Sequence, residues 1–436
     1  MKSKVQFIFL YLLTLMGCEK GPVGKLEDPR VILISIDGLR GDLLTDSIFK
    51  NNCPNMYNLM SIGTFCANVQ SVFPSLTYPA HTSMISGVMP KKHGIFHNKP
   101  FVPNNNFAEW YWYQDKVKTP TLITEIKKRG LVSLGISWPV TVGAPINYML
   151  PEIQSVNDSI STIDLIKKHD NPKRFLESAK IRGVIPDNGN PQGYTRDLLL
   201  HELFLDAFKE KTPHLSLYHM IETDLAQHKY GKNSREAINA FMFMDSLIGN
   251  IIALLAENNL WSSTTLIITG DHGFRNYSKQ LSINKLFEEK GWINIEKGEI
   301  KDWRVIGLSS GGSAFIRIKN DENNDFKKKV RVTLARQEEF ETLERRHMNS
   351  FLWAPIETDF LLLAKENYCF IQSLDQSYIT EKSGGTHGGD PRNSQLKTGY
   401  IAAGRGIEKG VLKNMMITDI AFQISALLDL NLSQRN

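Results

Sequence analysis

Carboxylate and imidazole side chains stand directly after several short apolar runs of the chain, and a further histidine lies in a glycine-rich segment near its end. The set comprises Asp37, Asp224, His228, Asp271, His272 and His387. A mixture of Asp and His is what borderline divalent ions such as zinc prefer. Six ligands are too many for one tetrahedral zinc ion and are suited to two. The residue types therefore predict a site for two metal ions.

Each member of this set also has an ordinary structural explanation. An Asp after a strand is usually a turn former or a helix cap. Asp224 and His228 could be a surface pair one helical turn apart, and the segment 383–390 could be only a flexible turn. The joint placement favours the metal site, because ligands collect where the carboxyl ends of parallel strands meet.

A threonine, Thr77, precedes a helix-compatible stretch with Pro79 near its start. A hydroxyl there would lie at a helix N-terminus, where a phosphate is well received. Threonine is a weak nucleophile at neutral pH and becomes competent when a metal ion binds its oxygen and lowers its pKa. The alternative is that Thr77 only caps the helix while His81 packs nearby.

The elements that must position these side chains alternate between strands and helices. Apolar, β-branched runs at 31–36, 131–138, 215–221 and 266–269 predict buried parallel strands. Apolar residues between 238 and 255 recur at spacings of mostly three and four, which predicts a helix that Ser234 could cap. A strand at 399–403 and a helix from about 418 to 430 complete the pattern. We expect an α/β fold with a mostly parallel sheet.

The segment 277–383 is charged and breaks this alternation, so we expect an inserted subdomain there. The catalytic domain then comprises 30–276 and 384–430. The 436 residues are 42% hydrophobic and carry a net charge of only +5, from 51 basic and 46 acidic residues. Because the two signs are mixed along the chain, we expect no nucleic-acid polymer as a partner.

The N-terminus has the pattern of an export signal. Lys2 and Lys4 precede an apolar run over 5–17, which is too short to span a bilayer and is typical of a secretory h-region. The run ends in Leu15-Met16-Gly17-Cys18, which resembles a bacterial lipobox. We expect a signal peptide at 1–17, a lipid on Cys18, a tether at 18–29 and a membrane lipoprotein facing the periplasm or the cell surface. The alternative is an ordinary cleaved signal with an incidental cysteine.

Three further cysteines, Cys53, Cys66 and Cys369, cannot all pair with one another. One disulfide, between Cys53 and Cys66, could form in an oxidising compartment, and the alternative is that these cysteines are buried free thiols.

Five blocks of the chain resemble, in the same order, those of the type I phosphodiesterase and nucleotide pyrophosphatase family of the alkaline phosphatase superfamily. The resemblance covers about 30–430 and is weakest in 277–380. The blocks are Ile34-Ser35-Ile36-Asp37-Gly38-Leu39-Arg40, Phe73-Pro74-x-x-Thr77-x-Pro79-x-His81 followed by Gly87-x-x-Pro90-x-x-His93-Gly94-Ile95, Glu222-Thr223-Asp224-x-x-x-His228-x-Tyr230-Gly231, Thr269-Gly270-Asp271-His272-Gly273, and Gly385-Thr386-His387-Gly388.

The resemblance implies an alkaline phosphatase-like three-layer sandwich and two zinc ions per chain. One ion would use Asp224, His228 and His387, and the other Asp37, Asp271 and His272, with Thr77 as the nucleophilic ligand. Attack by Thr77 would form a phosphothreonine that water then hydrolyses. The resemblance assigns Asn98 to a phosphate oxygen. The family usually has Asp before this Asn and the chain has His97, so the local hydrogen bonds should differ.

The substrate is less well defined by the sequence. Family members that use nucleotides have an aromatic directly after the nucleophile, where the chain has Tyr78, and Tyr148 is a candidate for the second aromatic or a plain loop residue. The segment 110–113, Trp-Tyr-Trp-Tyr, could line the pocket or pack as core. The prediction is a nucleotide phosphodiesterase or pyrophosphatase. The alternatives are a relative acting on phosphonates, phosphomonoesters or lipid and choline phosphodiesters, and a catalytically silent binding protein.

Overall fold

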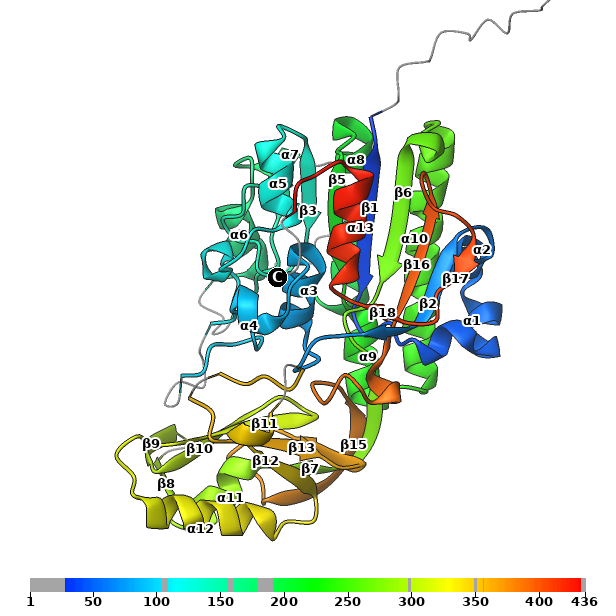
Figure 1. Ribbon diagram of the computed structural model, residues 1–436. Helices are drawn as coiled ribbons and strands as arrows, with labels where there is room; N and C mark the ends of the chain where they lie inside the picture. Colours follow the sequence, from blue (N-terminus) through cyan, green and yellow to red (C-terminus); the bar gives the residue numbers. More distant parts are fainter. Residues whose placement is uncertain are drawn as a thin grey trace, which may run out of the picture.

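Two lobes make up the part of the chain that the computed structural model describes, which is residues 28–102, 109–155, 160–178, 191–296, 299–348, 351–355 and 357–432. The larger lobe is built on a nine-stranded sheet, and the smaller lobe lies beyond the lower end of that sheet in Figure 1. The predicted signal peptide, Cys18 and most of the tether lie outside the described residues, so lipidation stays a prediction.

The central sheet has the strand order β17-β2-β16-β6-β1-β5-β3-β4, with β18 paired to β2. The five strands from β6 to β4 run parallel, whereas β16 is antiparallel to both β6 and β2. This confirms the prediction of a mostly parallel sheet. The strands are β1 (Arg30–Ile36), β2 (Thr64–Gln70), β3 (Ser133–Ile136), β4 (Tyr148–Leu150), β5 (Leu215–Met220), β6 (Thr264–Thr269), β16 (Thr398–Gly404), β17 (Gly410–Val411) and β18 (Met415–Met416).

Helices cover both faces of this sheet, which makes the three-layer sandwich (Figure 1). Successive β1 side chains point to opposite faces, as strand geometry requires. Ile32 and Ile34 join one apolar cluster, and Val31 and Leu33 join the other. The first cluster includes residues of α1 (Ser47–Asn52), α2 (Pro54–Ile62), α6 (Thr162–His169), α7 (Phe175–Ser178), α8 (Gly193–Lys211) and α10 (Arg235–Glu257), and the second those of α3 (Thr77–Ser86), α5 (Leu122–Lys128) and α13 (Asp419–Leu427).

Helix α10 shows how local sequence fixes an element. Ser234 is its N-cap, and the Ser234 hydroxyl accepts a hydrogen bond from the Ala237 N–H at 3.1 Å. Such a cap stabilises a helix by about 1 kcal/mol. The helix is the one among the described residues that is long and apolar enough to cross a membrane, but half of its apolar window is buried within the fold. Its apolar stripe packs on the sheet, as the periodicity predicts.

The smaller lobe has its own apolar core between a four-stranded antiparallel sheet, α11 and α12. Its boundary strands β7 and β15 pair with each other, so the predicted end of the insertion at residue 383 falls inside β15. The elements are β7 (Arg275–Leu281), α11 (Ile283–Glu289), β8 (Ile293–Glu296), β9 (Glu299–Trp303), β10 (Val305–Ser309), β11 (Ser313–Ile318), α12 (Asn324–Ala335), β12 (Phe340–Glu344), β13 (Phe360–Ala364), β14 (Asn367–Phe370) and β15 (Ile379–Thr386).

Cysteines and surface charge settle two smaller points. Cys53, Cys66 and Cys369 are all buried and free, so the Cys53–Cys66 disulfide does not form and the alternative of buried thiols holds.

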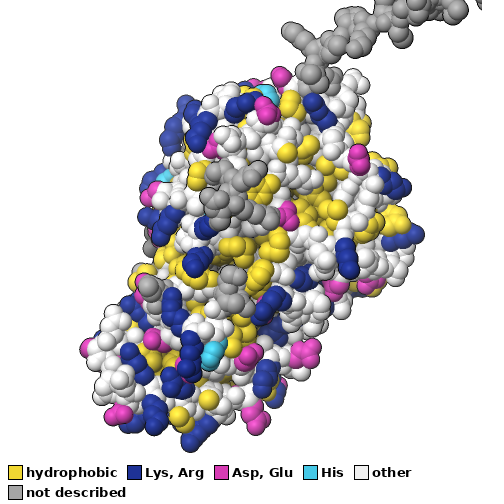
Figure 2. Space-filling model, in the orientation of Figure 1, with side chains coloured by type: hydrophobic (Ala, Val, Ile, Leu, Met, Phe, Trp, Pro, Cys, Tyr) yellow, Lys and Arg dark blue, Asp and Glu magenta, His cyan; other side chains and the backbone are white. Residues whose placement is uncertain are grey.

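Figure 2 shows Lys and Arg side chains interspersed with Asp and Glu over both lobes of the face in view. The mixed signs along the sequence are therefore also mixed in space on this face.

Candidate active site

Thr77 is the first residue of helix α3, and Leu76 before it is the N-cap. No side chain caps this helix, so the Thr77 hydroxyl does not serve as the cap that the alternative interpretation required. The Thr77 side chain instead lines a polar cavity of about 510 Å³, although only 8% of the residue is exposed. A hydroxyl at an uncapped helix N-terminus lies where an anion is stabilised by free backbone N–H groups.

Two neighbouring parallel strands deliver the first group of candidate ligands. Asp37 follows β1, and Asp271 and His272 follow β6. The Asp271 Oδ1 atom accepts hydrogen bonds from the Gly38 and His272 N–H groups, at 2.9 and 3.0 Å. Its Oδ2 lies 3.1 Å from His272 Nε2, and Asp37 Oδ1 lies 3.3 Å from the same nitrogen. One oxygen of each carboxylate thus faces the His272 imidazole.

A helix and a loop deliver the second group. Asp224 and His228 lie one turn apart on α9 (Glu222–Tyr230), and His387 directly follows β15. The Nε2 atoms of the two histidines are 3.0 Å apart, and they lie 3.4 and 3.6 Å from Asp224 Oδ1. Their Nδ1–H groups donate to the carbonyls of Gly385 and Ser75, at 2.9 and 2.8 Å. These bonds fix both rings with Nε2 turned inward, as in metal-ligating histidines.

Buried polar atoms without a hydrogen-bond partner mark the same place. They include Asp37 Oδ1, Asp224 Oδ1, Asp271 Oδ2 and His272 Nε2. Buried polar atoms are normally paired, and an unpaired set of carboxylate oxygens and imidazole nitrogen calls for a cation. The residues present therefore fit divalent metal ions of the kind that accept mixed oxygen and nitrogen ligands.

The electrostatics of the group agree with this interpretation. Burial, and then the nearby carboxylates of Asp271 and Asp224, raise the pKa of Asp37 well above its usual range. Burial raises the pKa of Asp224 to about 6. Burial and neighbouring histidines lower the pKa values of His272 and His387 well below the ordinary value, so both rings stay neutral. Neutral imidazoles are ready ligands, and a bound cation would offset the carboxylate repulsion.

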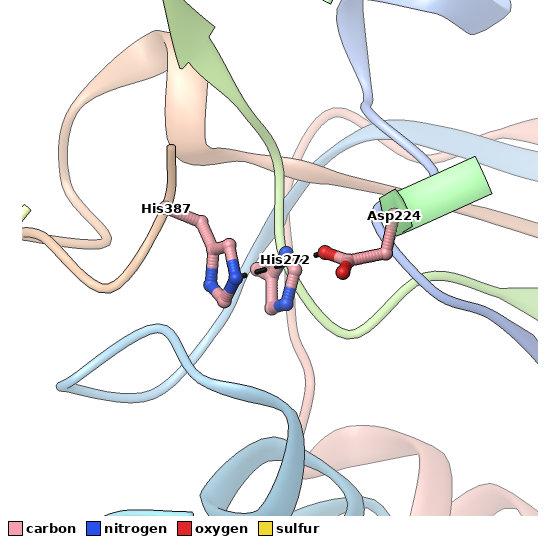
Figure 3. Close-up of side chains that lie close together, drawn as sticks. All are labelled: Asp224, His272 and His387. Carbon is pink, nitrogen blue, oxygen red and sulfur yellow. Dashed lines mark ion pairs between the residues drawn. The ribbon is translucent and has the colours of Figure 1, made fainter. Parts of the chain in front are cut away.

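His272 lies between the two groups rather than in one of them. Its ligand atom is within 4.8 Å of those of Asp37 and Asp271, and also of those of Asp224 and His387. Its ring stacks on the His387 ring with centroids 3.6 Å apart. Figure 3 shows His272 and His387 side by side with the Asp224 carboxylate directed toward them. The two predicted ligand sets are thus brought together into one continuous cluster.

Asn98 lines the polar cavity together with Thr77 and with Asp37, Asp224, His228 and His387 of the cluster. Its side-chain oxygen accepts a hydrogen bond from the Tyr78 N–H at 3.0 Å, which leaves the NH₂ group free to donate to a bound oxyanion. His97 before it bonds the Ser309 carbonyl through Nε2 at 3.3 Å and accepts from the Lys99 N–H at 3.1 Å. The histidine at this position therefore ties the Asn98 loop to β10 of the smaller lobe.

The two tyrosines predicted to hold a base are not placed to do so. Tyr78 is fully buried, with its hydroxyl 3.3 Å from Glu152 Oε1, and offers no exposed face. Tyr148 lies at the first residue of β4, at the amino ends of the parallel strands, whereas the cluster lies at their carboxyl ends. Its ring contacts Phe175 and lies 5.2 Å from Lys211 Nζ. Trp110, whose ring is 5.2 Å from that of Tyr78, is the aromatic that lines the cavity.

Two cavities meet at the cluster. The polar one is also lined by Glu152, Arg196 and Glu222. The other, of about 300 Å³, lies between the lobes and has mostly apolar walls that include Leu76, Phe101, Val102, Ile306 and Leu308. Asn98, Trp110, His228 and His387 line both. A ligand bound at the cluster would therefore have room on two sides.

Sequence reasoning missed three residues near the cluster. His219 is the next-to-last residue of the apolar strand β5, Glu152 follows β4, and Arg196 lies in the first turn of α8. A histidine within an apolar run was a usable signal, because a buried imidazole needs partners. No sequence signal pointed to Glu152, because the strand before it, β4, has only three residues and was not predicted. Burial would lower the pKa of His219, but hydrogen bonds to Asp37 and Glu152 outweigh it and raise that pKa to about 10.

Comparison with known proteins adds to this geometry. A family model described as type I phosphodiesterase / nucleotide pyrophosphatase matches residues 31–390. The chain is 24% identical over 411 residues to the human ectonucleotide pyrophosphatase/phosphodiesterase family member 1, covering 89% of this chain and 38% of that protein. It is 26% identical over 293 residues to the human bis(5'-adenosyl)-triphosphatase ENPP4, covering 65% and 55%. The chain thus spans only part of the length of these curated relatives.

Solved structures show the same fold. The murine ectonucleotide pyrophosphatase/phosphodiesterase 5, as an inactive threonine-to-alanine variant in complex with AMP, superposes with a TM-score of 0.68 at 18% identity, covering 94% of this chain and 97% of that one. The human protein of the same name gives a TM-score of 0.67, also at 18% identity, over 93% and 96%. The alkaline phosphatase-like architecture expected from the sequence is therefore confirmed.

Proposed function

The chain belongs to the type I phosphodiesterase / nucleotide pyrophosphatase family, and from that membership we propose that it is a metal-dependent hydrolase of phosphodiester or pyrophosphate bonds in nucleotides. The observation that carries the proposal is the convergence of five Asp and His side chains, with His228 in contact with two of them, around the cavity that the Thr77 hydroxyl lines. A nucleotide substrate is supported by the names of the curated relatives and by the AMP bound to the structural neighbour.

The proposed reaction proceeds in two displacements. Thr77 Oγ1 gives up its proton to solvent water and attacks phosphorus, the bond to the leaving oxygen breaks and the leaving group departs, and a phosphothreonine forms. Water then attacks the same phosphorus and releases Thr77. The NH₂ group of Asn98 donates to a non-bridging oxygen in both steps. Metal ions bound by the six ligands would supply Lewis-acid stabilisation of the charge on these oxygens.

Hydrolysis of p-nitrophenyl thymidine 5′-monophosphate, compared with p-nitrophenyl phosphate, tests the substrate class. We expect the diester to be the better substrate, as measured by kcat/KM. Equal or faster hydrolysis of the monoester would favour the phosphomonoesterase alternative. Arg196 is the observation behind that alternative, because it lines the polar cavity and forms no ion pair with a described carboxylate. The intact ligand set argues against the catalytically silent alternative.

Metal content tests the cofactor proposal. Because the six ligands form one cluster of two overlapping groups, we expect about two zinc ions per chain in protein purified without chelator. Removing them should lower the melting temperature, since a ligand bound only to the folded state stabilises it. Elemental analysis and thermal melts with and without chelator measure both. Fully active protein without metal would contradict the proposal.

Membrane anchoring is a separate part of the proposal and rests on residues 1–18 alone. Expressed in a bacterial host, the protein should take up labelled palmitate and sediment with membranes. Cys18→Ser should abolish the label, because the thiol is the acylated atom. An unlabelled wild-type protein would refute lipidation and would leave ordinary secretion open.

A further inference from the structure

A buried histidine outside the ligand cluster contacts the Asp37 carboxylate through the oxygen that does not face His272. His219 lies on β5, in register with Ser35 of β1, and has no exposed surface. Its Nε2 atom is 3.2 Å from Asp37 Oδ2. The other carboxylate oxygen, Oδ1, is the one that faces His272 and has no hydrogen-bond partner. The two oxygens of Asp37 therefore have different partners, and His219 decides which one remains free.

The His219 ring is itself held from its other nitrogen. Nδ1 lies 3.0 Å from Glu152 Oε2 and 3.3 Å from the Ser137 carbonyl. Glu152 Oε1 in turn accepts a hydrogen bond from the Tyr78 hydroxyl at 3.3 Å. Tyr78 directly follows the nucleophile candidate, so this set of contacts joins the backbone next to Thr77 to the Asp37 carboxylate. Buried hydrogen-bond networks of this kind rigidify the groups they connect.

We propose that His219, oriented by Glu152, is a positioning residue that turns Asp37 Oδ1 toward the metal beside Thr77. The inference rests on the proposed metal-dependent function and adds two residues that the family motifs in the sequence do not contain. Removing a side chain that orients a metal ligand typically costs about 10- to 100-fold in metal affinity or activity. A buried histidine that only fills space would affect folding stability instead.

Three variants separate these roles. His219→Leu removes both N–H groups and keeps bulk, so we expect zinc affinity at the site that includes Asp37 and kcat each to fall by about 10- to 100-fold, with KM changed much less. His219→Gln can place an amide N–H near the position of Nε2 and should recover much of both. Glu152→Gln keeps the shape of the side chain but weakens its hydrogen bond with His219 Nδ1. It should lower zinc affinity and kcat on the order of 3- to 10-fold.

His201→Leu is the matched control. His201 is equally buried on α8, stacks on Tyr218, and contacts Asn250 at 3.3 Å, but neither cavity at the cluster includes it. It should lower the melting temperature of the metal-free protein while zinc affinity and kcat stay within about twofold of wild type, as expected for a site with no shared partner. Zinc affinity is measured by chelator competition, alongside melting of the metal-free proteins.

The outcomes distinguish this inference from the proposed function. Wild-type protein that binds no zinc overturns the metal-dependent function itself. Wild type with two zinc ions, beside His219→Leu and Glu152→Gln variants with unchanged zinc affinity and kcat, overturns the positioning role alone. If His219→Leu does not fold, the Glu152→Gln result decides, because that variant retains the His219 contacts with Asp37 and Ser137. If His201→Leu lowers zinc affinity and kcat as much as His219→Leu does, the inference is also overturned, because the loss would then follow from replacing any buried histidine.

Discussion

Replacing Thr77 by alanine is expected to lower kcat for p-nitrophenyl thymidine 5′-monophosphate by a factor on the order of 10³ or more, because no covalent intermediate can form. Thr77→Ser keeps the hydroxyl and should retain measurable turnover. The structure sharpens this contrast, since the helix begins at Thr77 with Leu76 as its N-cap and loses no side-chain cap in either variant. Both variants should therefore fold and bind metal like wild type.

Thr82→Ala is the control for removing a threonine hydroxyl from the same helix. Thr82 is buried in α3 and donates to the Tyr78 carbonyl at 2.8 Å, away from the cavity. It should cost about 1 kcal/mol of stability, the usual value of one hydrogen bond, with kcat little changed. Rapid quenching of wild type with a slow diester should trap phosphorus on a peptide that contains Thr77. Wild-type turnover in Thr77→Ala would end the nucleophile assignment.

His272→Ala should be the most damaging change among the histidine ligands. Its Nε2 atom lies 3.3 Å from Asp37 Oδ1 and 3.1 Å from Asp271 Oδ2, and its ring stacks on His387. Without the His272 imidazole, the buried carboxylates of Asp37 and Asp271 repel each other with fewer polar contacts to offset the repulsion. The group of Asp224, His228 and His387 also loses a nearby ligand. We expect zinc content below one ion per chain and kcat lowered on the order of 10³-fold, as when metal-ion catalysis is lost.

His228→Ala is the matched comparison. The His228 side chain is 42% exposed and contacts only the Asp224 and His387 side of the cluster. It should lose about one zinc ion and leave the other bound by Asp37, Asp271 and His272. Elemental analysis of the two variants, purified in parallel, measures the difference. Equal zinc loss in both would show that His272 has no special place between the two groups.

The metal-ligand candidates Asp37, Asp224 and Asp271 could be predicted from the sequence because they come soon after the buried parallel strands β1, β5 and β6, whereas His387 follows β15, which is antiparallel to β7. Runs of β-branched residues identify such strands, and the α/β rule then places their carboxyl ends at one edge. The sequence therefore predicts that Asp37 and Asp271 lie close together. In the structure Gly38, the residue after Asp37, bonds Asp271, which is 233 positions further along the chain. What the sequence did not show is the position of His272 between the groups, because ligand sharing depends on side-chain directions rather than on strand order.

Substrate-facing residues were harder to predict. Tyr78 follows the nucleophile in sequence, but on a helix consecutive residues point about 100° apart, and its ring packs into the core instead of the cavity. Tyr148 was assigned without knowing that β4 begins there, and a residue at the start of a parallel strand lies at the wrong end of the sheet. The smaller lobe was predicted as an insertion from its charge and from the break in the strand–helix alternation, neither of which defines strands, so its boundary was placed inside β15.

His387 has a consequence for the order in which this molecule can be completed. Its Nδ1–H donates to the carbonyl of Ser75, 312 residues earlier, and its own carbonyl accepts from Gly312 N–H at 2.6 Å in the smaller lobe. A growing chain thus holds Asp37 and Thr77 long before their last partner has been synthesised. Closing so large a loop is entropically costly and slow. Tight metal retention would therefore report that both lobes are in place, because a fragment ending before residue 387 lacks this ligand and also strands β16 to β18 of the central sheet.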